Sequence, residues 1–205
     1  ANIMTPSLQQ DLFMETLHDC IAPGKPTPYT SFVALNSGSE GVSFALRMAR
    51  VGECTGKDAF VRMGDSFHGR TDLPAIMSAS SDDAYARVLP GWHDHGPHVA
   101  TIPYNDVEAV ATTFKDLADR GYAVRAALVE PVQGEGSPGT AMTRDFYGAL
   151  RAVTQEYGSA LIMDSVQAGL RAQGVLSVVD YTTTRDMDPP DMEVFSKAIH
   201  AGQYP

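Results

Sequence analysis

The sequence predicts an α/β fold, in which a mostly parallel sheet carries helices on both faces. Short segments that are apolar along their whole length alternate with helical segments that are apolar on one side only. Strands covered on both faces have this continuous apolar character, and strands that alternate with helices are typical of parallel sheets. The 205 residues, 43% of them hydrophobic and 20% charged, are enough for one sizeable globular domain.

The first quarter of the sequence predicts a helix, a strand and a second helix. Residues 7–20 form the first helix, and the prolines of "APGKPTP" follow it. "SFVAL" (residues 31–35) predicts a buried strand, and "NSGSE" predicts a turn into a helix over residues 40–51. Four apolar residues recur at helical spacing in the first helix: Leu8, Leu12, Phe13 and Leu17.

The alternation continues to the end of the chain. Two further helices are predicted over residues 106–121 and 143–158, the second with a cap at Thr143 and a stop at Gly158. Four further strands are predicted: "DAFVRM" (58–63), "VRAALVE" (124–130), "SALIMD" (159–164) and "MEVFS" (192–196).

This architecture predicts where a ligand would bind. In open α/β sheets, ligands bind outside the carboxyl ends of the strands. We therefore expect one crevice to be lined by the residues that follow the predicted strands: Asn36–Ser39, the Phe67 region, Glu130, Asp164–Gln167 and Lys197.

Composition excludes some classes of partner. The net charge of −10 and the pI near 4.9 argue against general nucleic-acid binding. No apolar run is long enough to span a bilayer, and no signal-peptide pattern begins the sequence, so we expect no membrane association. Cys20 and Cys54 lack a paired spacing, which favours free thiols and a reducing compartment such as the cytoplasm or an organelle matrix.

The histidine-containing string "GWHDHGPH" raises the question of a metal site. It holds His93, His95 and His98, but glycine and proline flank it and no cysteine or upstream carboxylate stands at ligand spacing. We expect a polar surface loop or a subunit contact there, and no metal.

A predicted helix start and a predicted strand end could bind the phosphate and the ring of a cofactor. Ser37, Gly38 and Ser39 precede a helix, where backbone N–H groups and hydroxyls can bind a phosphate, although an ordinary helix cap explains them equally well. Asp164 ends an apolar strand, where a carboxylate needs a cation or several donors. A protonated ring nitrogen is one such cation, and capping of a following helix is the alternative.

Lys197 follows the last predicted strand. Burial lowers the pKa of a lysine ammonium, and a lysine with a lowered pKa is the nucleophile that forms Schiff bases with aldehydes. A phosphate site, a strand-end aspartate and a strand-end lysine together match the phosphate, the pyridine nitrogen and the aldehyde of pyridoxal 5'-phosphate.

Six strings carry a family resemblance: "NSGSE" (36–40), "FHGRT" (67–71), "PYND" (103–106), "EPVQGEG" (130–136), "DSVQAG" (164–169) and "FSKAIHAG" (195–202). With these strings in this order, the chain resembles the class III (subgroup II) aminotransferases. These fold-type I pyridoxal-phosphate enzymes include ornithine, 4-aminobutyrate and lysine ε-aminotransferases. Members of the family are longer, so the resemblance implies that residues 1–205 are the cofactor-binding large domain, with an N-terminal segment and a small C-terminal domain outside it.

The resemblance implies roles for the residues around the cofactor. Gly38 and Ser39 would hold the phosphate, and Phe67 would stack on the pyridine ring with His68 close by. Asp164 would pair with the ring nitrogen and keep it protonated.

It also implies roles on the reacting side. Gln167 would bind the phenolic oxygen of the ring, and Lys197 would form the Schiff base and then move the substrate proton. Glu130 would lie near cofactor and substrate, and Glu135 would help to gate the substrate carboxylate. The family usually has Asp-Glu-Val-Gln, and Ser165 replaces that glutamate here.

The function implied is transamination between an amino acid or ω-amine and a 2-oxo acid, in a homodimer. Two alternatives stay open. One is another pyridoxal-phosphate reaction on the same scaffold, such as that of an aminomutase or a decarboxylase. The other is a non-catalytic structural subunit with the same fold, against which the pair of Asp164 and Lys197 argues.

Overall fold

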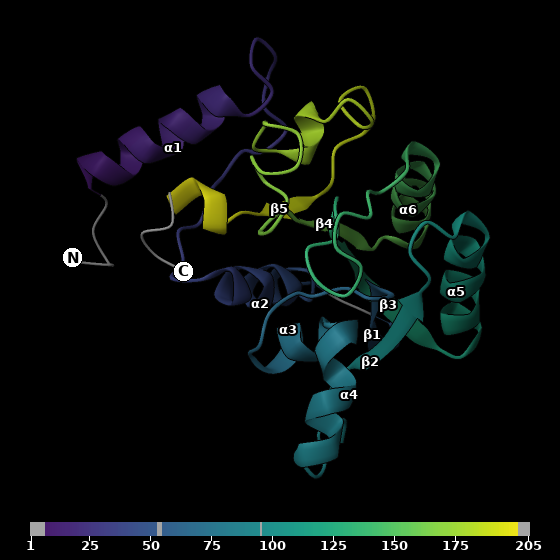
Figure 1. Ribbon diagram of the computed structural model, residues 1–205. Helices are drawn as coiled ribbons and strands as arrows, with labels where there is room; N and C mark the ends of the chain where they lie inside the picture. The colour runs from purple at the N-terminus through teal and green to yellow at the C-terminus, as the bar shows by residue number, and fades with distance from the viewer. Residues whose placement is uncertain (1–6, 53–54, 95, 201–205) are drawn as a thin grey trace.

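The computed structural model describes residues 7–52, 55–94 and 96–200, and it confirms the α/β fold class (Figure 1). Five strands form one sheet in the order β2-β1-β3-β4-β5, and every pairing is parallel. The strands are β1 (Lys57–Met63), β2 (His98–Ile102), β3 (Tyr122–Val129), β4 (Ala160–Asp164) and β5 (Met192–Val194).

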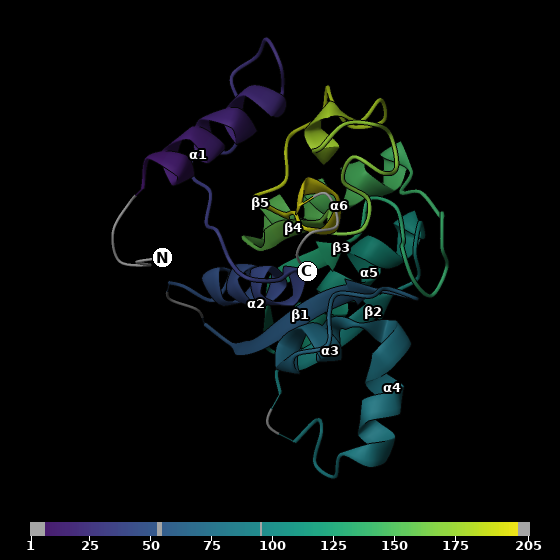
Figure 2. The same ribbon diagram turned by 60° about the vertical axis from the view of Figure 1, so that its left-hand side comes forward.

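Helices cover both faces of this sheet. The helices α5 (Val107–Asp119) and α6 (Arg144–Tyr157) pack on one face, and α2 (Gly38–Met48) and α3 (Asp72–Met77) lie on the other (Figures 1 and 2). Neighbouring residues of a strand point to opposite faces. Phe60 therefore packs in the core beneath α2, while Val61 packs in the core beneath α5 and α6.

Polar side chains cap the starts of α5 and α6, and the sequence predicts the second of these caps. The side chain of Asp106 accepts a hydrogen bond from Ala109 N (3.0 Å) at the start of α5, and Thr143 Oγ1 accepts one from Phe146 N (3.3 Å) at the start of α6. Gly158 ends α6 in the left-handed conformation (φ 65°), which confirms the predicted cap and stop.

The strand predicted over residues 31–35 is wrong. This segment forms no strand, and Val33 and Leu35 are exposed. The edges of the sheet are β2 and β5, and the segment pairs with neither within the described residues. An apolar run favours burial, but a strand also needs a neighbouring strand whose backbone N–H and C=O groups are free to pair with it.

The sequence missed three elements between residues 72 and 102. They are α3, α4 (Ala79–Val88) and β2. The strand β2 is an edge strand and only its last residue, Ile102, is fully buried, so it lacks the continuous apolar run of the central strands. His98, assigned above to a surface loop, is its first residue.

The first helix forms as predicted but packs differently. Helix α1 (Leu8–Cys20) stands apart from the sheet, and Figure 1 shows it at the end of a long connection. Only Leu17 of its apolar positions is buried, whereas Leu8, Leu12 and Phe13 are exposed. Cys20 is a free, exposed thiol, and Cys54 lies outside the described residues. No helix in the described ranges has both the length and the apolar character needed to cross a membrane.

Candidate active site

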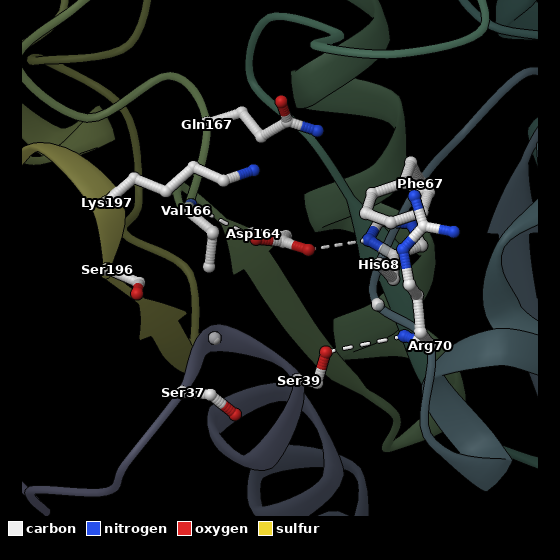
Figure 3. A pocket seen from close by; sticks show the side chains of 12 residues that line it. Ser37, Ser39, Phe67, His68, Arg70, Asp164, Val166, Gln167, Ser196 and Lys197 are labelled. Atoms are coloured by element: carbon white, nitrogen blue, oxygen red, sulfur yellow. Dashed lines mark hydrogen bonds and ion pairs between the residues drawn. The ribbon is translucent and has the colours of Figure 1, made fainter. Parts of the chain in front are cut away.

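A cavity of about 230 Å³ opens beside the carboxyl ends of the central strands (Figure 3). Segments far apart in the sequence meet there: the start of α2, the loop after β1, the turn after β4 and the residues after β5. Seven predicted site residues line it: Gly38, Ser39, Phe67, His68, Asp164, Gln167 and Lys197. The expected crevice is therefore present.

The start of α2 forms one wall of the cavity. Ser37 is its N-cap, and its Oγ accepts a hydrogen bond from Glu40 N (3.2 Å) while the Glu40 carboxylate accepts one from Asn36 N (2.8 Å). Ser39 Oγ accepts a hydrogen bond from Arg70 N (3.3 Å), which ties the helix start to the loop after β1. Backbone N–H groups at a helix start favour an anion.

Glycine is required at position 38 because the backbone approaches the turn after β4 closely. A Cβ atom on Gly38 would lie 2.9 Å from Val166 Cγ1, a distance that carbon atoms do not tolerate. The same closeness holds at Gly69, where a Cβ would lie 2.4 Å from Ser39 Oγ and φ is +128°. The glycines therefore bring three segments together at the cavity.

Asp164 at the end of β4 is buried and already has two partners. Its Oδ2 lies 2.7 Å from His68 Nδ1, and its Oδ1 accepts a hydrogen bond from Val166 N (3.1 Å). Because a carboxylate only accepts hydrogen bonds, His68 Nδ1 carries a hydrogen. Each carboxylate oxygen has a further lone pair, so Asp164 can accept another donor from the cavity.

Glu130 lies behind Phe67 rather than in the cavity wall. Its Oε2 accepts a hydrogen bond from Phe67 N (3.0 Å) and its Oε1 accepts one from Gly134 N (3.1 Å). Burial raises the pKa of Glu130 to about 7, and the Asp164 carboxylate adds to this rise, whereas His68 opposes it. Glu130 thus holds the backbone of Phe67, and Glu135, also predicted at the substrate side, is half-buried outside the lining of the cavity.

Gln167 and Lys197 both line the cavity. The Nε2 atom of Gln167 is buried and has no hydrogen-bond partner within the described residues. Lys197 is half-buried at the start of a short 3₁₀ helix (Lys197–His200), and its backbone is in the left-handed region (φ 33°). Figure 3 shows its side chain extending from the residues after β5 into the space between Gln167 and Asp164.

The structure adds lining residues that the sequence did not single out. Val166 and Phe67 lie on either side of the Asp164 carboxylate (Figure 3). The Arg70 guanidinium lies over the Phe67 ring, 5.2 Å from its centroid. Of these residues, Phe67 was predicted and Val166 and Arg70 were not. Arg70 belongs to "FHGRT" and Val166 to "DSVQAG", and this position within a motif is the signal that could have found them.

No metal site appears in the described part of the "GWHDHGPH" string. His93 Nε2 lies 3.6 Å from Asp82 Oδ1, and Trp92 Nε1 donates a hydrogen bond to the same oxygen (2.7 Å). No group of three or more potential metal ligands occurs within the described ranges, and His95 lies outside them.

A comparison of the sequence with known protein families identifies the family of this chain. The model of the family "Aminotransferase class-III" matches residues 2–205. The chain belongs to the class-III aminotransferases.

Solved structures of known proteins have a similar fold. An ornithine aminotransferase from Toxoplasma gondii is 25% identical, with a TM-score of 0.63 over 83% of this chain and 38% of its own. An S-selective transaminase from Arthrobacter sp. is 22% identical, with a TM-score of 0.66 over 83% of this chain and 40% of its own.

A third structure, described as a transaminase with PLP bound, is 20% identical, with a TM-score of 0.71 over 98% of this chain and 43% of its own. The two at 22% and 20% identity show the fold alone. The chain therefore spans between 38% and 43% of the length of these three structures.

Proposed function

We propose that this chain carries the pyridoxal-phosphate site of a transaminase, which moves an amino group from an amino acid or ω-amine to a 2-oxo acid. One observation carries the proposal. A lysine amine, a buried carboxylate held by a histidine and the start of a helix line a single cavity at the carboxyl edge of the sheet. An amine, an anion site and a strand-end acid are the three groups that this cofactor needs.

The residues present fit the cofactor. Its phosphate would bind at the start of α2, where Ser39 supplies a hydroxyl and Gly38 allows close approach. Its ring would lie between Phe67 and Val166. The orphaned Nε2 of Gln167 supports this fit, because a buried amide donor without a partner indicates an acceptor that belongs there, such as the phenolic oxygen of the ring.

Asp164 would accept a hydrogen bond from the protonated ring nitrogen. The hydrogen bond from His68 Nδ1 orients the Asp164 carboxylate in its buried place. His68 acts through Asp164 and is therefore a positioning residue. When bound, pyridoxal phosphate supplies an electron sink that stabilises negative charge on the substrate carbon.

The Lys197 amine would anchor the cofactor through its aldehyde. Once the substrate amine has taken its place, the freed Lys197 amine would act as a base that removes the proton from the substrate carbon. It would then act as an acid that gives this proton back. Its half-buried place in the cavity, between Gln167 and Asp164, allows both tasks. Glu130 would keep Phe67 in place, and Glu135 would act at the substrate side.

We further propose that the active protein is a homodimer of the cytoplasm or an organelle matrix. Exposed apolar side chains on and before α2 support a subunit contact beside the cavity: Val33, Leu35, Phe44 and Met48. Within the described residues, the only cysteine is a free thiol, which suits a reducing compartment.

A spectroscopic experiment on the full-length protein tests the proposed function. Added pyridoxal phosphate is expected to produce a visible absorption band that borohydride bleaches, with the cofactor's mass then fixed on Lys197. The matched control is Lys197→Arg, which keeps a positive charge but has no amine that can condense with an aldehyde. A wild-type protein that shows no band would refute the proposal.

A further inference from the structure

The carboxylate of Glu193 lies at the centre of a hydrogen-bond network beside the cavity. Its Oε2 accepts hydrogen bonds from Tyr29 Oη (2.7 Å) and Ser177 Oγ (2.5 Å). Its Oε1 accepts one from Val178 N (2.9 Å) and one from the Ser165 hydroxyl. The carboxylate therefore joins four segments: its own strand β5, the approach to α2, the turn after β4 and the loop before β5.

The four donors satisfy this carboxylate completely. A carboxylate has about four lone-pair positions, and each is used here. The residue is partly exposed along the edge strand, but its carboxyl group is enclosed. Burial raises the pKa of Glu193, whereas the hydroxyls of Ser165, Ser177 and Tyr29 and the N–H of Val178 oppose the rise by stabilising the anion. An enclosed, fully partnered charge holds its neighbours in fixed places.

One of these neighbours connects Glu193 to the cavity. Ser165 directly follows Asp164, and its backbone N–H donates to Val194 O (2.9 Å) on β5. The Ser165 hydroxyl donates to Glu193 on the same strand, so the residue is tied to β5 twice. Lys197 follows Glu193 by four positions on the same segment. The two ties therefore fix the turn that begins at Asp164 against the segment that presents the Lys197 amine.

The residue at position 165 makes this arrangement possible. It is a serine that is almost fully buried, and its hydroxyl is one of the four donors to Glu193. A second carboxylate at 165 would meet the Glu193 carboxylate at short range, and like charges in an enclosed place repel strongly.

We propose that Glu193 is a positioning residue that, through Ser165, sets the spacing between the Asp164 carboxylate and the Lys197 amine. This inference rests on the proposed function, because that spacing matters only if one ligand binds both groups. Glu193 does not line the cavity itself. Its effect on a ligand passes through Ser165 and β5.

Two matched variants of the full-length protein separate positioning from stability. Ser165→Ala and Ser177→Ala each remove one hydroxyl donor from the same carboxylate, and both serines are almost fully buried. Only Ser165 adjoins Asp164. The measurements are the melting temperature of each apoprotein, the Kd of added pyridoxal phosphate, and the pH midpoint at which the visible band of the bound cofactor changes.

Both variants are expected to lower the apoprotein melting temperature, and Ser177→Ala lowers it by more because Ser177 Oγ also accepts a hydrogen bond from Val179 N (3.2 Å). Ser165→Ala is expected to weaken pyridoxal-phosphate binding by about tenfold and to shift the pH midpoint of the band, whereas Ser177→Ala changes the Kd by less than about twofold. Equal Kd values and equal pH midpoints in the two variants would overturn the inference. A wild-type protein that binds no pyridoxal phosphate would instead refute the proposed function, so the two failures are distinguishable.

Discussion

The Nδ1 atom of His68 lies 2.7 Å from Oδ2 of Asp164, with both side chains almost completely shielded from solvent. The two residues are far apart in the sequence, one after β1 and the other at the end of β4. A carboxylate held in this way has its orientation set by the protein before any ligand arrives. Such preorganisation lowers the cost of binding a group that must meet the carboxylate at a fixed angle.

Replacing the histidine of this pair is expected to destabilise the fold. His68→Ala leaves the buried Asp164 carboxylate without its side-chain donor, and the free energy of unfolding should fall by about 3 kcal/mol. Urea unfolding at neutral pH measures this. The control is His98→Ala, which removes a half-buried histidine stacked on Tyr122 (4.5 Å between centroids) and should cost about 1 kcal/mol. Equal losses in the two variants would contradict the role given to the buried pair.

Gly38→Ala at the start of α2 is expected to lower the free energy of unfolding by about 1–3 kcal/mol, because the new methyl group would overlap the Val166 side chain. Pyridoxal phosphate should also bind more weakly, since Val166 lines the cavity. Gly148→Ala in α6 is the matched control: its Cβ would lie 3.2 Å from the terminal methyl of Met187, which can move, and alanine favours helix. Chemical unfolding measures the stability of each variant, and titration with pyridoxal phosphate measures its affinity. A Gly38→Ala protein as stable as the wild type would contradict the close contact with Val166.

Glu130 should make stability depend on pH. The folded protein holds the pKa of Glu130 at about 7, above its ordinary value of 4.5, so the folded state favours the protonated acid. The stabilisation from that proton is present below about pH 4.5 and is lost as the pH rises through about 7. Relative to Glu130→Gln, the wild type should therefore lose up to about 3 kcal/mol between about pH 5 and about pH 8.

Paired denaturant titrations of the wild type and Glu130→Gln measure this difference. Glu108→Gln, at an exposed position in α5, serves as the control and should leave the pH dependence unchanged. A wild-type protein whose stability tracks that of Glu130→Gln across this range would show that the Glu130 carboxyl titrates normally.

Ser165→Glu is expected to place two carboxylates together and to destabilise the protein by about 3 kcal/mol. The double variant with Glu193→Gln removes one of the two charges and should recover a large part of this loss. A double-mutant cycle by denaturant titration gives the coupling energy. If the two changes were simply additive, the side chains at positions 165 and 193 would not interact as the structure indicates.

Local patterns in the sequence were sufficient to predict the central strands and the long helices. The strands β1, β3 and β4 contain runs of buried apolar residues because both of their faces are covered, and these runs can be recognised without a structure. Thr143 and Gly158 mark the ends of α6 by chemistry that acts within one helical turn. The edge strand β2 was missed and residues 31–35 were wrongly assigned, because pairing and coverage depend on distant segments.

The candidate site also has features that the sequence predicts and features that only the tertiary structure shows. The sequence by itself predicted which residues would hold the cofactor, because motifs such as "FHGRT" and "DSVQAG" specify side chains and their order. Only the tertiary structure decided which of them meet. It placed Glu130 behind Phe67 rather than in the cavity, and it brought Glu193 to Ser165 across two paired strands. Hydrogen bonds and close contacts act over a few ångströms in space, and separation along the chain carries no record of that distance.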